Sequence, residues 1–217
     1  MKKLAIILTP LTVFLAIVLY TTLATSYAGS NEPSQDATLD TSKQYKTAVF
    51  AGGCFWCIEA DFEKLEGVIE VVSGYTGGSK ETANYKTVTY NETGHFEAVE
   101  VLYNPNIVSY AQLVEYFWRH IDPTNSRGQF CDSGSSYLSA IFYGDEQEHD
   151  IVKKSLSALQ KNKPFKEPIV TTIAAAKPFY LAEDYHQDYY KKNPIRYNLY
   201  RSGCRRDQRV KQLWGSK

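Results

Sequence analysis

Apolar and polar residues follow the short periods of strands and helices from about residue 45 onward. Residues 45–51 (YKTAVFA) are mostly β-branched, aromatic or small and predict a strand, which Gly52 and Gly53 end. Residues 54–65 (CFWCIEADFEKL) place large apolar side chains at helical spacing and predict a helix. Residues 68–75 (VIEVVSGY) then predict a second strand.

The alternation of strands and helices continues to about residue 190. Residues 95–103 (HFEAVEVLY) alternate as a strand does, and Ser109 is placed to cap a helix that runs to Trp118. Further strands are predicted at residues 137–143 and 169–174, and further helices at residues 146–160 and 182–190. From about residue 191 the chain is basic and we expect an irregular tail. The order β-α-β-β-α-β-α-β predicts an α+β fold, a two-layer sandwich of a mixed β-sheet with helices packed on it and a ferredoxin-like core.

The N-terminus has the pattern of a secretory signal peptide. Basic residues precede an apolar run over residues 4–19, and small residues flank a cut after Ala28. The alternative is an uncleaved membrane anchor, because apolar character extends to about residue 24. We predict a signal peptide at residues 1–28, a flexible polar linker at residues 29–44 and one domain at residues 45–217, exported and periplasmic.

Charge and composition narrow the classes of function. The chain carries 24 basic and 24 acidic side chains, so its formal net charge is zero, which argues against a nucleic-acid binder that needs a basic surface. Apolar residues at 43% and charged residues at 22% are typical of a globular domain. A domain of this size buries a core without disulfides, so the four cysteines are candidates for chemistry.

The candidate chemistry is concentrated at the turn between the first strand and the first helix. Gly52 and Gly53 allow a tight turn that puts Cys54 at the helix N-terminus, where backbone N–H groups and the helix dipole favour a thiolate. Cys57 lies one turn further along the same side of the helix. In this arrangement one thiol can attack a substrate and the other can resolve the product.

Other interpretations of the cysteines remain open at this point. With Cys131 and Cys204 the pair could complete a zinc site, although those two are widely separated singletons. Cys54 and Cys57 could form a structural disulfide, which would close too short a loop to stabilise much. They could also act on substrate disulfides, as in a secreted thiol–disulfide oxidoreductase.

Several motifs together resemble the A-type peptide methionine sulfoxide reductases. The resemblance starts with residues 53–59 (GCFWCIE) and 72–78 (VSGYTGG). It continues at Tyr85 and at residues 93–99 (TGHFEAV), 132–137 (DSGSSY) and 182–189 (AEDYHQDY). These motifs span nearly all of the chain from Thr47 to about Tyr190 and are far more specific than a lone pair of cysteines.

The resemblance implies reduction of the S epimer of methionine sulfoxide, free or in oxidised proteins, with no bound cofactor and no metal. By position Cys54 is then the nucleophile, and Glu97 is the acid that protonates the sulfoxide oxygen. A carboxyl buried among aromatic residues would hold that proton, because burial raises its pKa. The other matching residues are the oxygen-binding Tyr85 and Tyr137, the site-ordering Asp132, and Phe55 and Trp56 of the methyl pocket. His186 is expected to be a hydrogen-bonding partner rather than a catalyst.

The resemblance also implies a sulfenic acid on Cys54, which another thiol converts to a disulfide that a thioredoxin-like partner reduces. Cys57 is our preferred first resolving residue, with Cys204 as a relay or an alternative, and Cys131 is unassigned. Many family members have glycine at the position of Cys57, so the order in which the cysteines of this chain resolve does not follow from those members. We expect the enzyme to act as a monomer.

Overall fold

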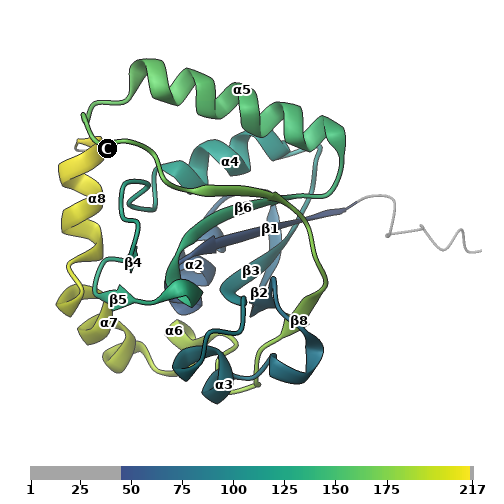
Figure 1. The fold of residues 1–217 in the computed structure, drawn as a ribbon, viewed down its shortest axis with the longest axis vertical. Coiled ribbons are helices and arrows are strands. Elements are labelled where there is room, and N and C mark those ends of the chain that lie inside the picture. The colour runs from purple at the N-terminus through teal and green to yellow at the C-terminus, as the bar shows by residue number, and fades with distance from the viewer. Residues whose placement is uncertain (1–44, 216–217) are drawn as a thin grey trace, which may run out of the picture. The chain divides into compact units, whose positions relative to one another are not determined.

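Residues 45–215 are described in the structure, a computed structural model. They form a six-stranded sheet with the order β7-β6-β1-β3-β2-β8 (Figure 1). Its strands are β1 (Lys46–Gly52), β2 (Val68–Thr76), β3 (Phe96–Tyr103), β6 (Ser139–Tyr143), β7 (Thr172–Ala175) and β8 (Phe179–Leu181). Only β6 and β7 pair in parallel, so the sheet is mixed. A separate two-stranded ribbon joins β4 (Gly128–Gln129) and β5 (Asp132–Ser133).

Seven α-helices and two short 3₁₀ helices occur in the described residues. The α-helices are α2 (Phe55–Phe62), α3 (Tyr85–Tyr90), α4 (Tyr110–Trp118), α5 (Glu146–Asn162), α6 (Tyr189–Lys192), α7 (Pro194–Gly203) and α8 (Arg206–Trp214). The 3₁₀ helices are η2 (Lys80–Thr82) and η3 (Ser135–Tyr137). Ser109 caps α4 in a complete capping box with Gln112, as its sequence pattern predicts.

The centre of the sheet has the ferredoxin-like arrangement. The succession β1-α2-β2-β3-α4-β6 gives the strand order β6-β1-β3-β2, in which each helix connects two parallel strands that are separated by an antiparallel one. Apolar side chains of α2, α4 and α5 meet those of the central strands in the main core, where Phe50, Phe117 and Trp118 are completely buried. The predicted α+β class, with a mixed sheet and packed helices, is confirmed.

Two predictions near the C-terminus are wrong. Residues 182–183 are irregular and residues 184–188 form turns rather than a helix, because their polar side chains bond to neighbouring elements: Gln187 accepts from Ser73 N at 2.9 Å and donates to Ser73 O at 2.9 Å. The expected irregular tail contains α7 and α8, and it is ordered because Tyr197, Arg206 and Leu213 are buried against the rest of the domain.

The predicted signal peptide and linker, residues 1–44, lie outside the described residues. Within residues 45–215 no helix combines the length and the apolar character that a membrane span requires.

Candidate active site

A tight turn presents the first cysteine of the motif. Strand β1 ends at Gly52, and Cys54 is the N-cap of α2 with 6% of its surface exposed. Gly53 has a φ of +84°, and a Cβ added there would lie 2.5 Å from the Cβ of Gln129. Only glycine fits this position, because an L side chain would be both strained and in collision. The turn therefore fixes Cys54 at the start of the helix.

A cavity of about 70 Å³ opens beside Cys54. Its lining brings together segments that lie far apart in the sequence, namely Cys54, Phe55, Trp56, Tyr85, Glu97, Asp132, Tyr137 and Tyr200. The seven residues predicted to act as nucleophile, acid, oxygen-binding tyrosines, site-ordering carboxylate and methyl pocket are all in this lining. Tyr200 is the eighth, and it was not predicted from the sequence.

Glu97 is a buried acid aimed at the helix N-terminus. It is 1% exposed, although the alternation of β3 alone would leave one acidic residue facing solvent. Its Oε2 accepts a hydrogen bond from Phe55 N at 3.1 Å. Burial raises the pKa of Glu97 to about 8, so the carboxyl carries a proton at neutral pH. A protonated carboxyl beside a thiol can supply a proton to an oxygen atom held between them.

Two tyrosines supply neutral hydroxyl groups at the same cavity. Tyr85 is the first residue of α3, and its backbone N–H donates to Glu183 Oε1 at 2.9 Å. Tyr137 ends η3 and hydrogen-bonds the Glu97 carboxyl. Burial raises the pKa of Tyr85 to about 12 and raises that of Tyr137 as well, so both phenols stay protonated. They can donate hydrogen bonds to a developing negative charge without bringing charge themselves.

The aromatic wall of the cavity is held rigidly. Trp56 donates through Nε1 to His186 Nδ1 at 2.9 Å and stacks on Tyr189 with ring centroids 3.7 Å apart. Phe55 packs on His186 at a centroid distance of 4.9 Å. Burial lowers the pKa of His186 to about 4, so its ring is neutral and serves as a hydrogen-bonding partner, as expected.

Asp132 reaches the cavity from β5 and meets a residue of the C-terminal segment. The Tyr200 hydroxyl of α7 donates to Asp132 Oδ2 at 2.5 Å. Burial raises the pKa of both side chains. The signal that could have found Tyr200 is helical: Pro194 is at a first helical position, and Tyr197 and Tyr200 follow at a spacing of one turn.

The four cysteines fall into two pairs. Cys54 and Cys57 are free and buried, whereas Cys131 and Cys204 form a disulfide. Burial raises the pKa of Cys54. A hydrogen bond from the Cys54 thiol lowers the pKa of Cys57, and the guanidinium groups of two arginines lower it further. Of the two thiols, Cys57 is therefore the more acidic.

The Cys131–Cys204 disulfide bears on two interpretations of the cysteines. Because the two sulfurs are bonded to each other, they cannot complete a zinc site with Cys54 and Cys57 in this state. For the same reason Cys204 is not a free thiol beside the nucleophile. Its sulfur, the Cys131 sulfur and an Asp132 carboxylate oxygen lie within 4.8 Å of one another, so the disulfide adjoins the cavity wall. Cys131 had no predicted role, because no spacing rule pairs residues 73 apart.

Comparison with known proteins gives one consistent result. The sequence profile of the family described as peptide methionine sulfoxide reductase matches residues 20–217. "Peptide methionine sulfoxide reductase MsrA" of Ligilactobacillus salivarius is 52% identical over 168 residues, which are 77% of this chain and 97% of that protein. The protein of the same name from Bacillus subtilis is 47% identical over 176 residues, covering 81% and 99%.

A relative from Vibrio cholerae, "Peptide methionine sulfoxide reductase MsrA/MsrB", is 45% identical over 188 residues. That match covers 86% of this chain but 50% of the relative, so the chain spans about half of that longer protein. Among solved structures, reduced Mxr1 from Saccharomyces cerevisiae has a TM-score of 0.66 at 31% identity, covering 70% of this chain and 87% of that one. Methionine sulfoxide reductase A of Corynebacterium diphtheriae has a TM-score of 0.59 at 30% identity, covering 70% and 76%.

Proposed function

The chain belongs to the peptide methionine sulfoxide reductase family, and we propose that it is an A-type enzyme. It reduces the S epimer of methionine sulfoxide to methionine, in oxidised proteins and as the free amino acid, and so repairs oxidative damage. The observation that carries this proposal is the meeting of Cys54, Glu97, Tyr85 and Tyr137 around one small cavity. These are a nucleophile, a protonated acid and two neutral hydrogen-bond donors, and no bound cofactor is needed for the reaction.

The reductive step follows from these positions. The sulfoxide oxygen lies among the donors Glu97, Tyr85 and Tyr137, which makes the attached sulfur electrophilic. The Cys54 sulfur attacks the sulfoxide sulfur while Glu97 protonates the oxygen, and the proton that leaves Cys54 replaces the one that Glu97 gives up. Transfer of that oxygen to Cys54 leaves methionine and a Cys54 sulfenic acid. The substrate gains two electrons and the cysteine loses two, so the step balances. Phe55 and Trp56 would hold the substrate's methyl group.

We propose that Cys57 resolves the sulfenic acid first. It lies on the same helix one turn from Cys54 and is free, whereas Cys204 is bonded to Cys131. A thioredoxin-like reductant then reduces the enzyme disulfide. Cys204 can serve as a relay once the thioredoxin-like reductant has reduced its disulfide with the exposed Cys131, because its freed thiol can then attack the Cys54–Cys57 disulfide.

We further propose that the protein acts as a monomer. We also propose that it is exported, since residues 1–28 have the pattern of a cleaved leader. Its reductant would then be a periplasmic or membrane-linked thioredoxin-fold protein. N-terminal sequencing of the protein purified from the periplasmic fraction tests the export: a mature terminus after Ala28 supports it, and an intact Met1 contradicts it.

The activity is tested with both epimers of a blocked methionine sulfoxide and dithiothreitol as reductant. We expect turnover of the S epimer only, and none in Cys54→Ser. Ser202→Ala, a change at an exposed residue of α7, is the control for purification and folding. Retained turnover in Cys54→Ser, or equal rates for the two epimers, would contradict the proposal.

A further inference from the structure

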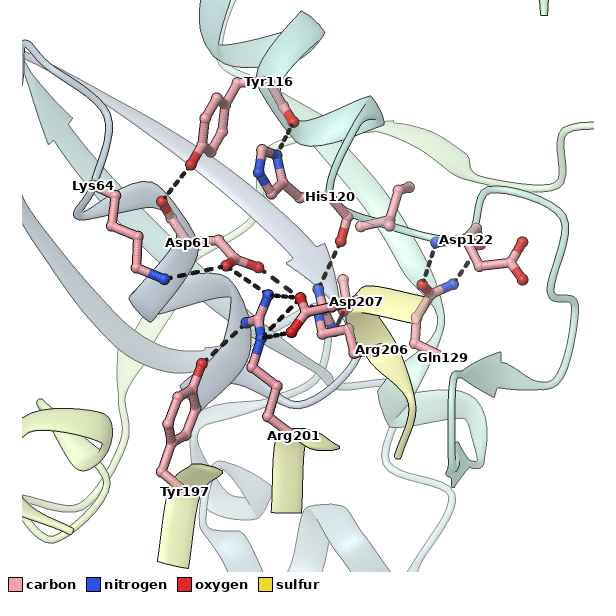
Figure 2. Close-up of polar contacts among 12 residues, drawn as sticks. Asp61, Lys64, Tyr116, His120, Asp122, Gln129, Tyr197, Arg201, Arg206 and Asp207 are labelled. Carbon is pink, nitrogen blue, oxygen red and sulfur yellow. Dashed lines mark hydrogen bonds and ion pairs between the residues drawn. The ribbon is translucent and has the colours of Figure 1, made fainter. Parts of the chain in front are cut away.

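A buried ion cluster lies on the nucleophile helix, and its central carboxylate does not line the sulfoxide cavity. The side chain of Asp61 is 4% exposed, and its Oδ1 meets Arg201 Nη2 at 2.9 Å (Figure 2). Its Oδ2 lies 3.6 Å from Arg206 Nε. Both arginines come from the C-terminal segment, one on each side of Cys204. The cluster therefore joins the segment that carries one disulfide sulfur to the helix that carries Cys54 and Cys57.

Arg206 braces the turn that presents Cys54. Its side chain is 2% exposed, and it donates from Nη1 to Gly52 O at 3.2 Å and from Nη2 to His120 O at 2.9 Å. Its guanidinium lies over the Phe130 ring, 4.3 Å from the centroid. A buried guanidinium is costly unless it is fully paired. Arg206 thus contacts the end of β1, the residues that follow α4, and Asp61 of α2. These contacts hold its positive charge close to the start of the nucleophile helix.

Arg201 completes the cluster next to Cys57. Its Nη1 donates to the Tyr197 hydroxyl at 3.0 Å, and its guanidinium also pairs with the largely exposed Asp207 (Figure 2). Tyr197 packs against Cys57 in a small buried cluster with Ala60 and Tyr189. Tyr197 thus connects the Arg201 guanidinium to the buried cluster around Cys57, and the charge of Arg201 acts on the thiol.

The geometry of α2 places the Cys57 thiol next to the ion cluster. Cys57 and Asp61 are four residues apart in α2 and therefore lie on the same face, one above the other. Cys57 is 2% exposed, so water does not solvate a charge on its sulfur. A thiolate in such a place depends on nearby cations. The titratable or charged groups around it are Cys54 and Asp61 of α2, Glu97 of β3, Tyr189 of α6, Tyr197 and Arg201 of α7, and Arg206 of α8.

We propose that Arg201 and Arg206, held in place by Asp61, are positioning residues for the resolving step, because they keep positive charge beside the Cys57 thiolate. The inference rests on the proposed reductase function with Cys57 as the resolving residue. In that step the electron pair of the Cys57 sulfur forms a bond to the Cys54 sulfur. The S–O bond of the sulfenic acid breaks, and the departing oxygen takes up the proton that Cys57 gives up and leaves as water. The C-terminal segment thus contributes to the resolving step through the charges of Arg201 and Arg206, in addition to carrying Cys204.

The two chemical steps are separated by a single turnover without reductant. Methionine formation reports the attack by Cys54, and mass spectrometry of rapidly alkylated peptides reports the Cys54–Cys57 disulfide. In Arg201→Gln we expect methionine at the wild-type rate. Disulfide formation should be at least tenfold slower at pH 7, and the midpoint of its pH profile should lie higher. Arg201→Lys restores a positive charge and should recover most of the rate. Arg196→Gln, a change at an exposed arginine of the same helix, should match the wild type in both steps.

Each outcome decides the matter. Wild-type disulfide formation and an unchanged pH midpoint in Arg201→Gln would overturn the inference. Equal slowing in Arg201→Gln and Arg201→Lys would also overturn it, since the effect would then be one of packing. Arg201→Met takes the place of Arg201→Gln if the latter does not fold. Absence of methionine with wild-type enzyme would instead refute the reductase function, and a Cys54 disulfide to another cysteine would refute Cys57 as the resolving residue.

Discussion

Replacing Glu97 by glutamine should remove activity and at the same time remove a pH-dependent loss of stability. The substituted side chain keeps the size of the original and stays neutral at every pH. It cannot give a proton to the sulfoxide oxygen, and loss of a general acid costs about 10²- to 10⁴-fold in rate. Methionine formation in a single turnover at pH 7 measures this loss.

The magnitude of the stability effect follows from the burial of the carboxyl. Its pKa is about 8 in the folded protein, against 4.5 for an ordinary glutamate. The folded state therefore binds the proton more tightly than the unfolded state does. The associated stability is fully present below pH 4.5, declines as the pH rises, and is lost above about pH 8. At about 1.4 kcal/mol per pKa unit, the loss is up to about 5 kcal/mol.

Urea unfolding at a series of pH values from 5 to about 8.5 measures the effect. We expect the free energy of unfolding of Glu97→Gln, minus that of the wild type, to increase with pH across this range and then to level off. If the amide group itself changes the stability, that change is the same at every pH, so it does not affect the slope of this difference against pH. Glu70→Gln is the matched control, because Glu70 lies exposed on the neighbouring strand β2. A difference that does not vary with pH would refute the argument that Glu97 is a buried, protonated acid.

Three further predictions concern other contacts. Tyr200→Phe removes the hydrogen bond to Asp132 and should lower kcat/KM with dithiothreitol by about ten- to a hundredfold; an unchanged value would mean that the hydroxyl plays no part. Ser109→Ala removes the capping box of α4 and should lower the free energy of unfolding in urea by about 1 kcal/mol, whereas no change would show that the cap is dispensable. The double variant Cys131→Ser/Cys204→Ser opens a link between residues 73 apart and should cost about 4 kcal/mol in non-reducing urea unfolding; equal midpoints and slopes in the two proteins would contradict this.

The elements predicted correctly are those specified by nearby residues. Strand β3 follows from its alternation, and α4 follows from its periodicity and from the cap at Ser109, which lies next to the helix that it begins. The turn with Cys54 is specified by the two glycines before it. Such signals lie within one or two turns of the residue concerned, so one sequence is enough to find them.

The features that were missed depend on contacts between distant segments. The C-terminal helices are held by the pairing of Arg201 and Arg206 with Asp61, about 140 residues earlier in the chain. Tyr200 enters the cavity only because this docking takes place. The Cys131–Cys204 pair likewise depends on the packing of two segments that no local pattern relates. The roles of Glu97 and the tyrosines came from the family resemblance, since alternation alone would have left Glu97 in solvent.

The volume of the cavity affects which methionine sulfoxide residues of a folded protein can be repaired. The cavity is small, about 70 Å³, so we expect only the tip of one side chain to enter it. A methionine sulfoxide enclosed in a folded protein can enter only when its surroundings open locally. The rate at which such a residue is repaired would then equal the fraction of molecules that are open at that site times the turnover of the open form. Differences in repair among the sites of one client would measure differences in local unfolding, and the flanking sequence would matter little.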